Sequence, residues 1–354
     1  MTDQPESTSR GNTFPERRRK KDRATEEDEE DASSPYFEPS AESKAESVKN
    51  EEKVKRSRQT FLSLSNGQLS TRLSLTNPTR RSDAARKPLK EIAAETKSLL
   101  PGLLATRPDV PDKGYLYKDG DAPLLDKKYC PRLLAARIRV INSDTIDAAL
   151  SLSASATNNR HPCVLNMANA NSAGGGWAHG ALAQEEALCY RTSLSKTLKK
   201  HYYPLPDRGG IYSPFVLVIR DNLRSGHDLL DLTNPAGLPA ISVVSVAAVC
   251  MPQTTRDANG HQKYALGQDM RLMEEKMRII LRMAVKNGHR QIVLGAFGCG
   301  AFANPRQEVA RMWANVLKDV EFSGGWWSDV VFAVLDDGRG NLHTFRNELD
   351  GIMV

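Results

Sequence analysis

The sequence predicts an α/β protein, a three-layer α/β/α sandwich with a mixed sheet, preceded by a disordered tail. From about residue 137, short β-branched runs alternate with amphipathic helical segments. These runs are apolar almost throughout, which is typical of strands covered by helices on both faces of a sheet. Residues 1 to about 82 are nearly all charged or small and polar, and such a segment cannot bury enough apolar area to fold.

The composition limits the class of protein. A chain of 354 residues with 40% hydrophobic and 26% charged residues can form one large soluble domain or two small ones. It has no apolar run of about 18 residues and no secretory leader, so we expect neither a membrane span nor export. Its five cysteines are widely spaced, which argues against a disulfide framework and a thiolate zinc site. The net charge of +6 permits an acidic ligand.

The tail, 1–82, pairs a basic cluster at 17–21 with an acidic block at 26–31. The basic cluster predicts nuclear import, although such clusters are also common in disordered tails. We therefore expect the protein in the nucleus, the cytoplasm or both. The folded region is predicted to be 83–354, with a helical N-terminal part at 83–136 and the α/β sandwich at 137–354.

Helix ends in the folded region carry recognisable signals. Pro88 suits a first turn, and Asp144 or Ser143 is placed to cap a helix. Asn304-Pro305-Arg306-Gln307 has the order of an N-cap, a first-turn proline and a capping-box partner. Helices are expected at 88–99, 144–150, 184–200, 268–287 and 305–320, and strands at 137–141, 163–167, 215–219, 241–249, 291–296 and 330–335.

The first of two notable loops leaves the strand at 163–167 and enters the helix at Gln184. Three glycines, 174–176, allow positive φ angles and a close approach of the backbone to a ligand. Two carboxylates, Glu185 and Glu186, then begin the helix. Glutamates alone in a first turn are ordinary partners of the helix dipole. The combination with the glycines on one strand-to-helix connection indicates a ligand site with acid/base chemistry.

The second loop, 295–304, also joins a strand to a helix and has glycines at 295, 298 and 300. Such loops present backbone N–H groups to phosphate oxygens. Phe297 and Phe302 can be core residues, or one of them can stack on a ribose or base. Cys299 is better explained as a small packing residue than as a nucleophile, because the sequence places no histidine to activate it.

Together the loops suggest a phosphate-bearing sugar as ligand. Gly174-Gly175-Gly176, followed after seven residues by Gln184-Glu185-Glu186, resembles the signature of poly(ADP-ribose) glycohydrolases. The surroundings resemble the microbial type of that family, within the macrodomain superfamily. The resemblance covers about residues 84–350, and its supporting stretches are 92–96, 164–169, 188–191, 293–302 and 331–336.

The resemblance implies hydrolysis of ribose–ribose O-glycosidic bonds in poly(ADP-ribose), with release of ADP-ribose, and a part in reversing ADP-ribosylation, as in the DNA damage response. It implies Glu186 as the catalytic acid/base and Glu185 as the holder of the ribose hydroxyls. Asn169 would position that ribose, with Asn171 as a rival. The remaining substrate-binding residues it implies are Gly174, Gly175, Gly176, Gln184, Gly298, Cys299, Gly300, Ala301 and Phe302.

The same resemblance implies no metal and no cofactor. The partners expected are ADP-ribose and poly(ADP-ribose) on modified proteins, without a need for direct DNA binding and without a membrane. Acid/base chemistry by a carboxyl suits the residues, because glycoside cleavage requires a proton on the leaving oxygen and the removal of one from water. Two alternatives stay open: a mono-ADP-ribosyl-protein hydrolase and a non-catalytic ADP-ribose reader, although a reader does not need the glutamate pair.

Overall fold

The computed structural model describes residues 87–153 and 161–354. All of them belong to the larger of two units of the chain, Lys49–Val354. The predicted tail, its basic cluster at 17–21 and the boundary at 82/83 lie outside the described residues, so these expectations stay predictions. None of the helices in the described ranges has the length and apolarity that a bilayer span needs.

The centre of the fold is a seven-stranded mixed sheet with the strand order β1-β4-β5-β3-β8-β9-β2. The five strands from β5 to β2 run parallel, and β1 and β4 add an antiparallel edge. The strands are β1 (Tyr115–Tyr117), β2 (Ile138–Ile141), β3 (Cys163–Met167), β4 (Gly210–Leu217), β5 (Ala240–Val246), β8 (Gln291–Leu294) and β9 (Asp329–Ala333), and a separate hairpin pairs β6 (Thr254–Arg256) with β7 (Gln262–Tyr264).

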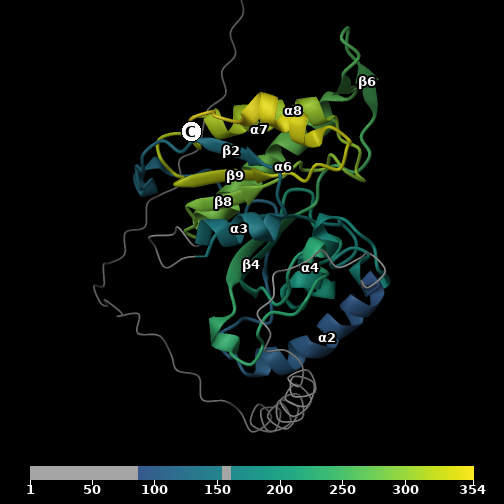
Figure 1. Cartoon of the computed structure of the whole chain (residues 1–354). Coiled ribbons are helices and arrows are strands. Elements are labelled where there is room, and N and C mark those ends of the chain that lie inside the picture. The colour runs from purple at the N-terminus through teal and green to yellow at the C-terminus, as the bar shows by residue number, and fades with distance from the viewer. Residues whose placement is uncertain (1–86, 154–160) are drawn as a thin grey trace, which may run out of the picture. The chain divides into compact units, whose positions relative to one another are not determined.

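Helices cover both faces of the sheet, which confirms the predicted three layers (Figure 1). Along β3, the side chains of Cys163 and Leu165 pack into one core and that of Val164 into the other. This alternation follows from the two-residue period of a strand. The first face carries α6 (Gly267–Lys286), α7 (Arg306–Lys318) and α8 (Asn341–Leu349), and the second carries α2 (Leu89–Ala105), α3 (Thr145–Ser153), α4 (Gln184–Arg191) and α5 (Leu194–Thr197).

The predicted elements are present, with some shifted ends. The strand at 163–167 is confirmed at both ends. β4 begins at Gly210, five residues before the prediction, and carries a bulge between Ser213 and Val216. The N-terminal part at 83–136 is not helical throughout, because it also supplies β1 to the sheet. Short 3₁₀ turns occur at Lys127–Tyr129, Trp177–His179, Lys200–Tyr202, Leu223–Ser225 and Pro235–Gly237.

The predicted helix at 184–200 is confirmed at its start, Gln184, and wrong at its end, because α4 ends at Arg191. Thr192 is extended and forms an isolated bridge with Val218. The carbonyl oxygen of Arg191 accepts the N–H of Ile219 at 2.8 Å, so the segment just after β4 takes up a group that would otherwise continue the helix. Sequence periodicity cannot detect this interruption, since it comes from a segment far along the chain.

Two cap predictions have different outcomes. Asp144 does cap α3, because its Oδ1 accepts the N–H of Ile146 at 2.8 Å. The capping box predicted for α7 is wrong: the helix starts at Arg306 and has no side-chain cap. Asn304 instead donates to the carbonyl of Val249 at 2.7 Å, and Gln307 donates to Glu348 at 2.6 Å.

Candidate active site

The two glycine loops emerge at the same edge of the sheet. β3 and β8 are parallel neighbours, with Cys163 opposite Ile292. Their carboxyl ends therefore lie together, as they do at ligand sites of open α/β sheets. The loops are also close in space, because a β-carbon on Gly295 would lie 3.3 Å from the Met167 side chain.

Gln184 fixes the start of α4 against the end of β3. Its Oε1 accepts the N–H of Met167 at 2.9 Å, and its Nε2 donates to the carbonyl of Leu165 at 2.7 Å. The side-chain amide thus makes the two backbone hydrogen bonds with β3 that a neighbouring strand would otherwise make. Both amide groups are committed to the backbone in this structure, so the observed contacts of Gln184 position the helix, and its predicted contact with substrate stays a prediction.

Glu185 lies almost wholly buried, with 3% of its surface exposed. Its Oε2 accepts the N–H of Asn169 at 2.7 Å, and its Oε1 accepts from Asn166 Nδ2 at 3.2 Å. Burial raises the pKa of Glu185 from 4.5 to about 7, and the neighbouring Glu186 charge adds to the rise while the hydrogen bonds oppose it. The carboxyl therefore exchanges a proton near neutral pH.

Glu186 is held directly by the first glycine loop. The N–H of Gly176 donates to its Oε1 at 2.9 Å. Gly175 has φ +57°, and a β-carbon there would overlap the same Oε1 and lie 3.1 Å from Glu185 Oε2. The glycine loop thus closes directly over both carboxylates, which brings the predicted catalytic pair and the predicted loop into one site.

Asn169 and Asn171 have different settings in the turn after β3. The Oδ1 of Asn169 accepts the N–H groups of Asn171 and Ser172 at 2.8 and 3.0 Å. Asn169 therefore shapes the loop as well as binding Glu185 through its main chain. Asn171 is exposed. The ribose-positioning role stays a prediction for both residues.

The second loop is organised around the side chain of Asn304. Its Nδ2 contacts the carbonyls of Gly298 and Phe302, and its Oδ1 accepts from the Tyr264 hydroxyl at 2.8 Å. Phe297 is fully buried, so it is a core residue, whereas Phe302 is partly exposed beside the loop. Gly300 is exposed, with nothing within 4 Å of the position of a β-carbon.

Cys299 has the environment of a packing residue. Burial raises the pKa of its thiol, which keeps it protonated and a poor nucleophile. All five cysteines are free thiols. In residues 87–153 and 161–354, histidine, cysteine and carboxylate side chains form no group of three that could hold a metal ion.

Sequence reasoning missed Asn166 as a residue of the site. This buried asparagine bridges Glu185 to Ser245 Oγ on β5, with the latter contact at 3.0 Å. The signal was present in the sequence, since Asn166 is the one polar residue in the apolar strand 163–167. A polar side chain at a position that faces the core needs a partner, and here that partner is the carboxylate.

The fold and the site define an α/β protein with a buried carboxylate pair. The model of the microbial-type PARG (poly(ADP-ribose) glycohydrolase) catalytic domain matches residues 116–221, which makes the class a glycosidic hydrolase. The predicted resemblance to this family is therefore confirmed. No curated protein matches the chain.

Solved structures agree with the family model. The poly(ADP-ribose) glycohydrolase of Thermomonospora curvata is 26% identical, with a TM-score of 0.60 over 73% of this chain and 98% of that one. The Deinococcus radiodurans enzyme in complex with ADP-ribose is 28% identical, with a TM-score of 0.55 over 70% and 97% of the two chains. The Thermomonospora enzyme bound to the inhibitor ADP-HPD gives 26% identity and a TM-score of 0.54 over 73% and 98%.

Proposed function

We propose that this chain is a poly(ADP-ribose) glycohydrolase that hydrolyses ribose–ribose O-glycosidic bonds and releases ADP-ribose. The observation that carries the proposal is the contact of Gly176 N–H with Glu186 beneath the glycine loop, 2.9 Å long. It joins a carboxyl group to the loop that the family signature assigns to the ligand. The Deinococcus relative that holds ADP-ribose gives the ligand class.

In the proposed mechanism, Glu186 acts first as an acid and then as a base. It donates a proton to the leaving ribose oxygen while the C–O bond breaks through an oxocarbenium-like transition state. It then takes a proton from the water that attacks the anomeric carbon, and a hemiacetal forms. A single group can do both because water enters on the side that the leaving sugar vacates.

Glu185 has a separate part in this proposal. Its two oxygens are fixed by Asn166 and Asn169, so it is a rigid acceptor for the ribose hydroxyls. Because burial raises its pKa to about 7, Glu185 is partly protonated at neutral pH and becomes a full carboxylate acceptor as the pH rises. Asn169, Gly174, Gly175 and the loop 298–302 are proposed to bind the sugars and the diphosphate.

The test is hydrolysis by the purified chain of labelled poly(ADP-ribose) and of a mono-ADP-ribosylated protein. Release of ADP-ribose from the polymer, with little release from the mono-modified protein, is the result expected. Cleavage of the mono-modified protein alone would replace the proposal with the second hydrolase. Binding of ADP-ribose without cleavage of either substrate would make the chain a reader.

The biological setting is also a proposal. The substrate would be polymer on modified proteins, and the activity would reverse ADP-ribosylation in the response to DNA damage. The basic cluster at 17–21, which lies outside the described residues, favours nuclear entry. A fluorescently tagged chain should accumulate in the nucleus, and exclusion from the nucleus in tagged cells would overturn this part.

A further inference from the structure

The helix that carries both carboxylates, α4, is short and depends on contacts at its two ends. It has eight residues, Gln184–Arg191, and Glu185 and Glu186 stand in its first turn. Isolated helices of this length are not stable in water, so tertiary contacts must hold α4 in place. Gln184 provides these contacts at the N-terminal end, and its Nε2 also lies 3.3 Å from Thr145 Oγ1 at the start of α3.

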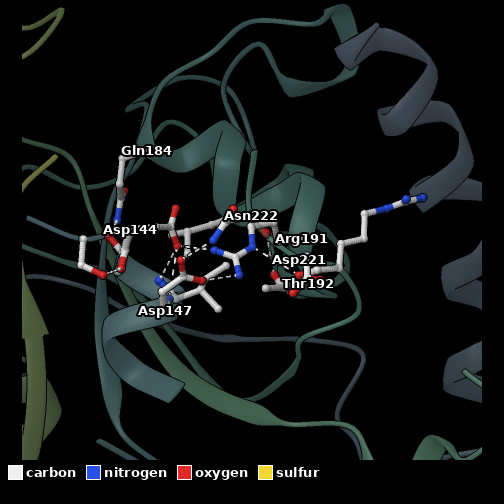
Figure 2. A network of polar contacts seen from close by, with 12 residues as sticks. Asp144, Asp147, Gln184, Arg191, Thr192, Asp221 and Asn222 are labelled. Carbon is white, nitrogen blue, oxygen red and sulfur yellow. Dashed lines mark hydrogen bonds and ion pairs between the residues drawn. The ribbon is translucent and has the colours of Figure 1, made fainter. Parts of the chain in front are cut away.

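Arg191 provides them at the other end. Its side chain is 2% exposed and pairs with Asp144, which precedes α3, and with Asp147 of α3, the latter at 2.7 Å. Figure 2 shows its guanidinium between these carboxylates and Asn222. The Nε of Arg191 reaches the carbonyl of Arg220 at 3.3 Å. The planar guanidinium therefore contacts α3 and the chain after β4 at the same time.

The acceptors of this cation are themselves fixed. Asp144 caps α3 through the N–H of Ile146 at 2.8 Å, and Asp147 Oδ2 accepts from Asn222 Nδ2 at 2.6 Å. Neither carboxylate can follow Arg191 freely if α4 moves. The cation also lies at the C-terminal end of α4, where the helix dipole favours positive charge.

We propose that Arg191 is a positioning residue that, through its pairs with Asp144 and Asp147, holds Glu186 against Gly176. The inference rests on the proposed function. From Glu185 to Arg191 the helix rises on the order of 9 Å. Over so short a distance the helix moves as a rigid body, so a tilt at Arg191 also displaces the carboxylates. Burying the charges of Arg191 and its two carboxylate partners costs desolvation free energy. The hydrogen bonds of the guanidinium to the carboxylates offset part of that cost and fix the geometry of the pair.

Arg191→Lys tests the fork, because one ammonium group cannot reproduce contacts in three directions. We expect kcat to fall about tenfold or more, since a displacement of about 1 Å can cost about 10²-fold in rate. The dissociation constant of ADP-ribose should change less than about threefold, because the loop at 298–302 is untouched. A merely structural role would lower the melting temperature without this kinetic pattern.

Arg282→Lys is the matched control. Arg282 lies on α6, on the opposite face of the sheet, and is also buried, 7% exposed. It contacts Glu321, after α7, at 2.8 Å and Glu275 of α6 at 3.0 Å. The control should lose comparable stability and keep kcat within about twofold. Equal losses of kcat in the two variants at a temperature well below both melting points would overturn the proposal.

Amide hydrogen exchange gives a readout that does not depend on activity. The Gly176 N–H, bonded to Glu186, should exchange faster in Arg191→Lys than in Arg282→Lys. Unchanged exchange at Gly176 in Arg191→Lys would overturn the positioning role. A wild-type chain that cleaves no ADP-ribose substrate would instead overturn the proposed function, while the exchange comparison would still decide the role of Arg191.

Asp147→Asn is a milder second variant if Arg191→Lys does not fold. Its side chain is 33% exposed, and the amide keeps the shape while it removes one of the two charges. The same decrease in kcat and the same faster exchange at Gly176 are expected, both smaller than in Arg191→Lys. Wild-type values of both quantities in Asp147→Asn would overturn the role of the pairs with α3.

Discussion

Gly175 has no room for a β-carbon because the carboxylate of Glu186 occupies the place where that carbon would stand. The backbone there also has φ +57°, which L residues rarely adopt. The catalytic candidate and the glycine loop are therefore in direct van der Waals contact within the fold. Gly175, which the sequence predicts to bind the ligand, is therefore also needed to make room for the carboxylate of Glu186.

Glu186→Gln should abolish turnover and leave ADP-ribose affinity within a few-fold. A general acid/base group typically contributes about 10²–10⁴-fold to the rate, and it acts mainly in the transition state. Polymer hydrolysis and calorimetric titration of ADP-ribose measure the two quantities. The exposed first-turn glutamate Glu91 of α2 supplies the control, since Glu91→Gln should be fully active. Activity of Glu186→Gln within about tenfold of wild type would remove Glu186 from the mechanism.

Gly300→Glu and Gly300→Lys should change ADP-ribose affinity in opposite directions. The position is open and has no positive φ angle, so both variants should fold as the wild type does. A carboxylate repels the diphosphate and an ammonium attracts it, and salt should weaken both effects. Titration of ADP-ribose at low and high ionic strength checks this. Equal affinities for the two variants would place the diphosphate elsewhere.

Gly175→Ala should lower both activity and stability, unlike the Gly300 variants. The added methyl group would push Glu186 Oε1 away and strain a left-handed residue. We expect a loss of kcat of about tenfold or more together with a lower melting temperature. Steady-state kinetics and thermal unfolding measure these. A variant with wild-type kcat would show that the loop moves away from Glu186 during turnover.

Glu185→Gln should stabilise the chain at pH 8 and not at pH 4. The pKa of Glu185 in the folded chain, about 7, lies above its usual value of 4.5, so its ionised form destabilises the fold. That penalty is absent below about pH 4.5 and complete above about pH 7, and it amounts to roughly 3 kcal/mol. Unfolding midpoints of both proteins across this range give the difference. A constant difference would mean that Glu185 titrates at its usual pH.

The same carboxyl predicts the pH dependence of activity. Glu185 is the proposed acceptor for the ribose hydroxyls and ionises near pH 7, so kcat/KM should rise as the pH rises through about 7. In Glu185→Gln this rise should move or disappear. A pH–rate profile of both proteins tests the assignment, and identical profiles would attribute the acidic limb of the profile to another group.

A chain that starts at Asp83 should retain full hydrolysis and lose nuclear enrichment. The residues of the candidate site all lie between Asn166 and Asn304, whereas the basic cluster at 17–21 lies before the truncation. Polymer assays and a fluorescent tag in cells measure the two properties. A truncated chain that keeps its circular dichroism spectrum and is inactive would mean that the tail completes the site.

The local sequence was sufficient wherever neighbours in the chain determine the outcome. Cys163–Met167 is a strand because five successive residues suit a covered sheet, and Asp144 caps a helix because its oxygen reaches the next turn. The glycine loop and Glu185-Glu186 are contiguous enough to be read as one site. For the same reason, the α/β class and the family resemblance followed from the sequence.

Tertiary structure alone decided what depends on distant segments. α4 stops at Arg191 because Ile219 donates to its carbonyl, and Asn304 leaves its helix uncapped because Val249 and Tyr264 bind its side chain. The raised pKa of Glu185 results from burial, which the residues next to it in the sequence do not predict. Hydrogen bonding and desolvation act through space, so contacts across many residues of chain override propensities that extend over only a few.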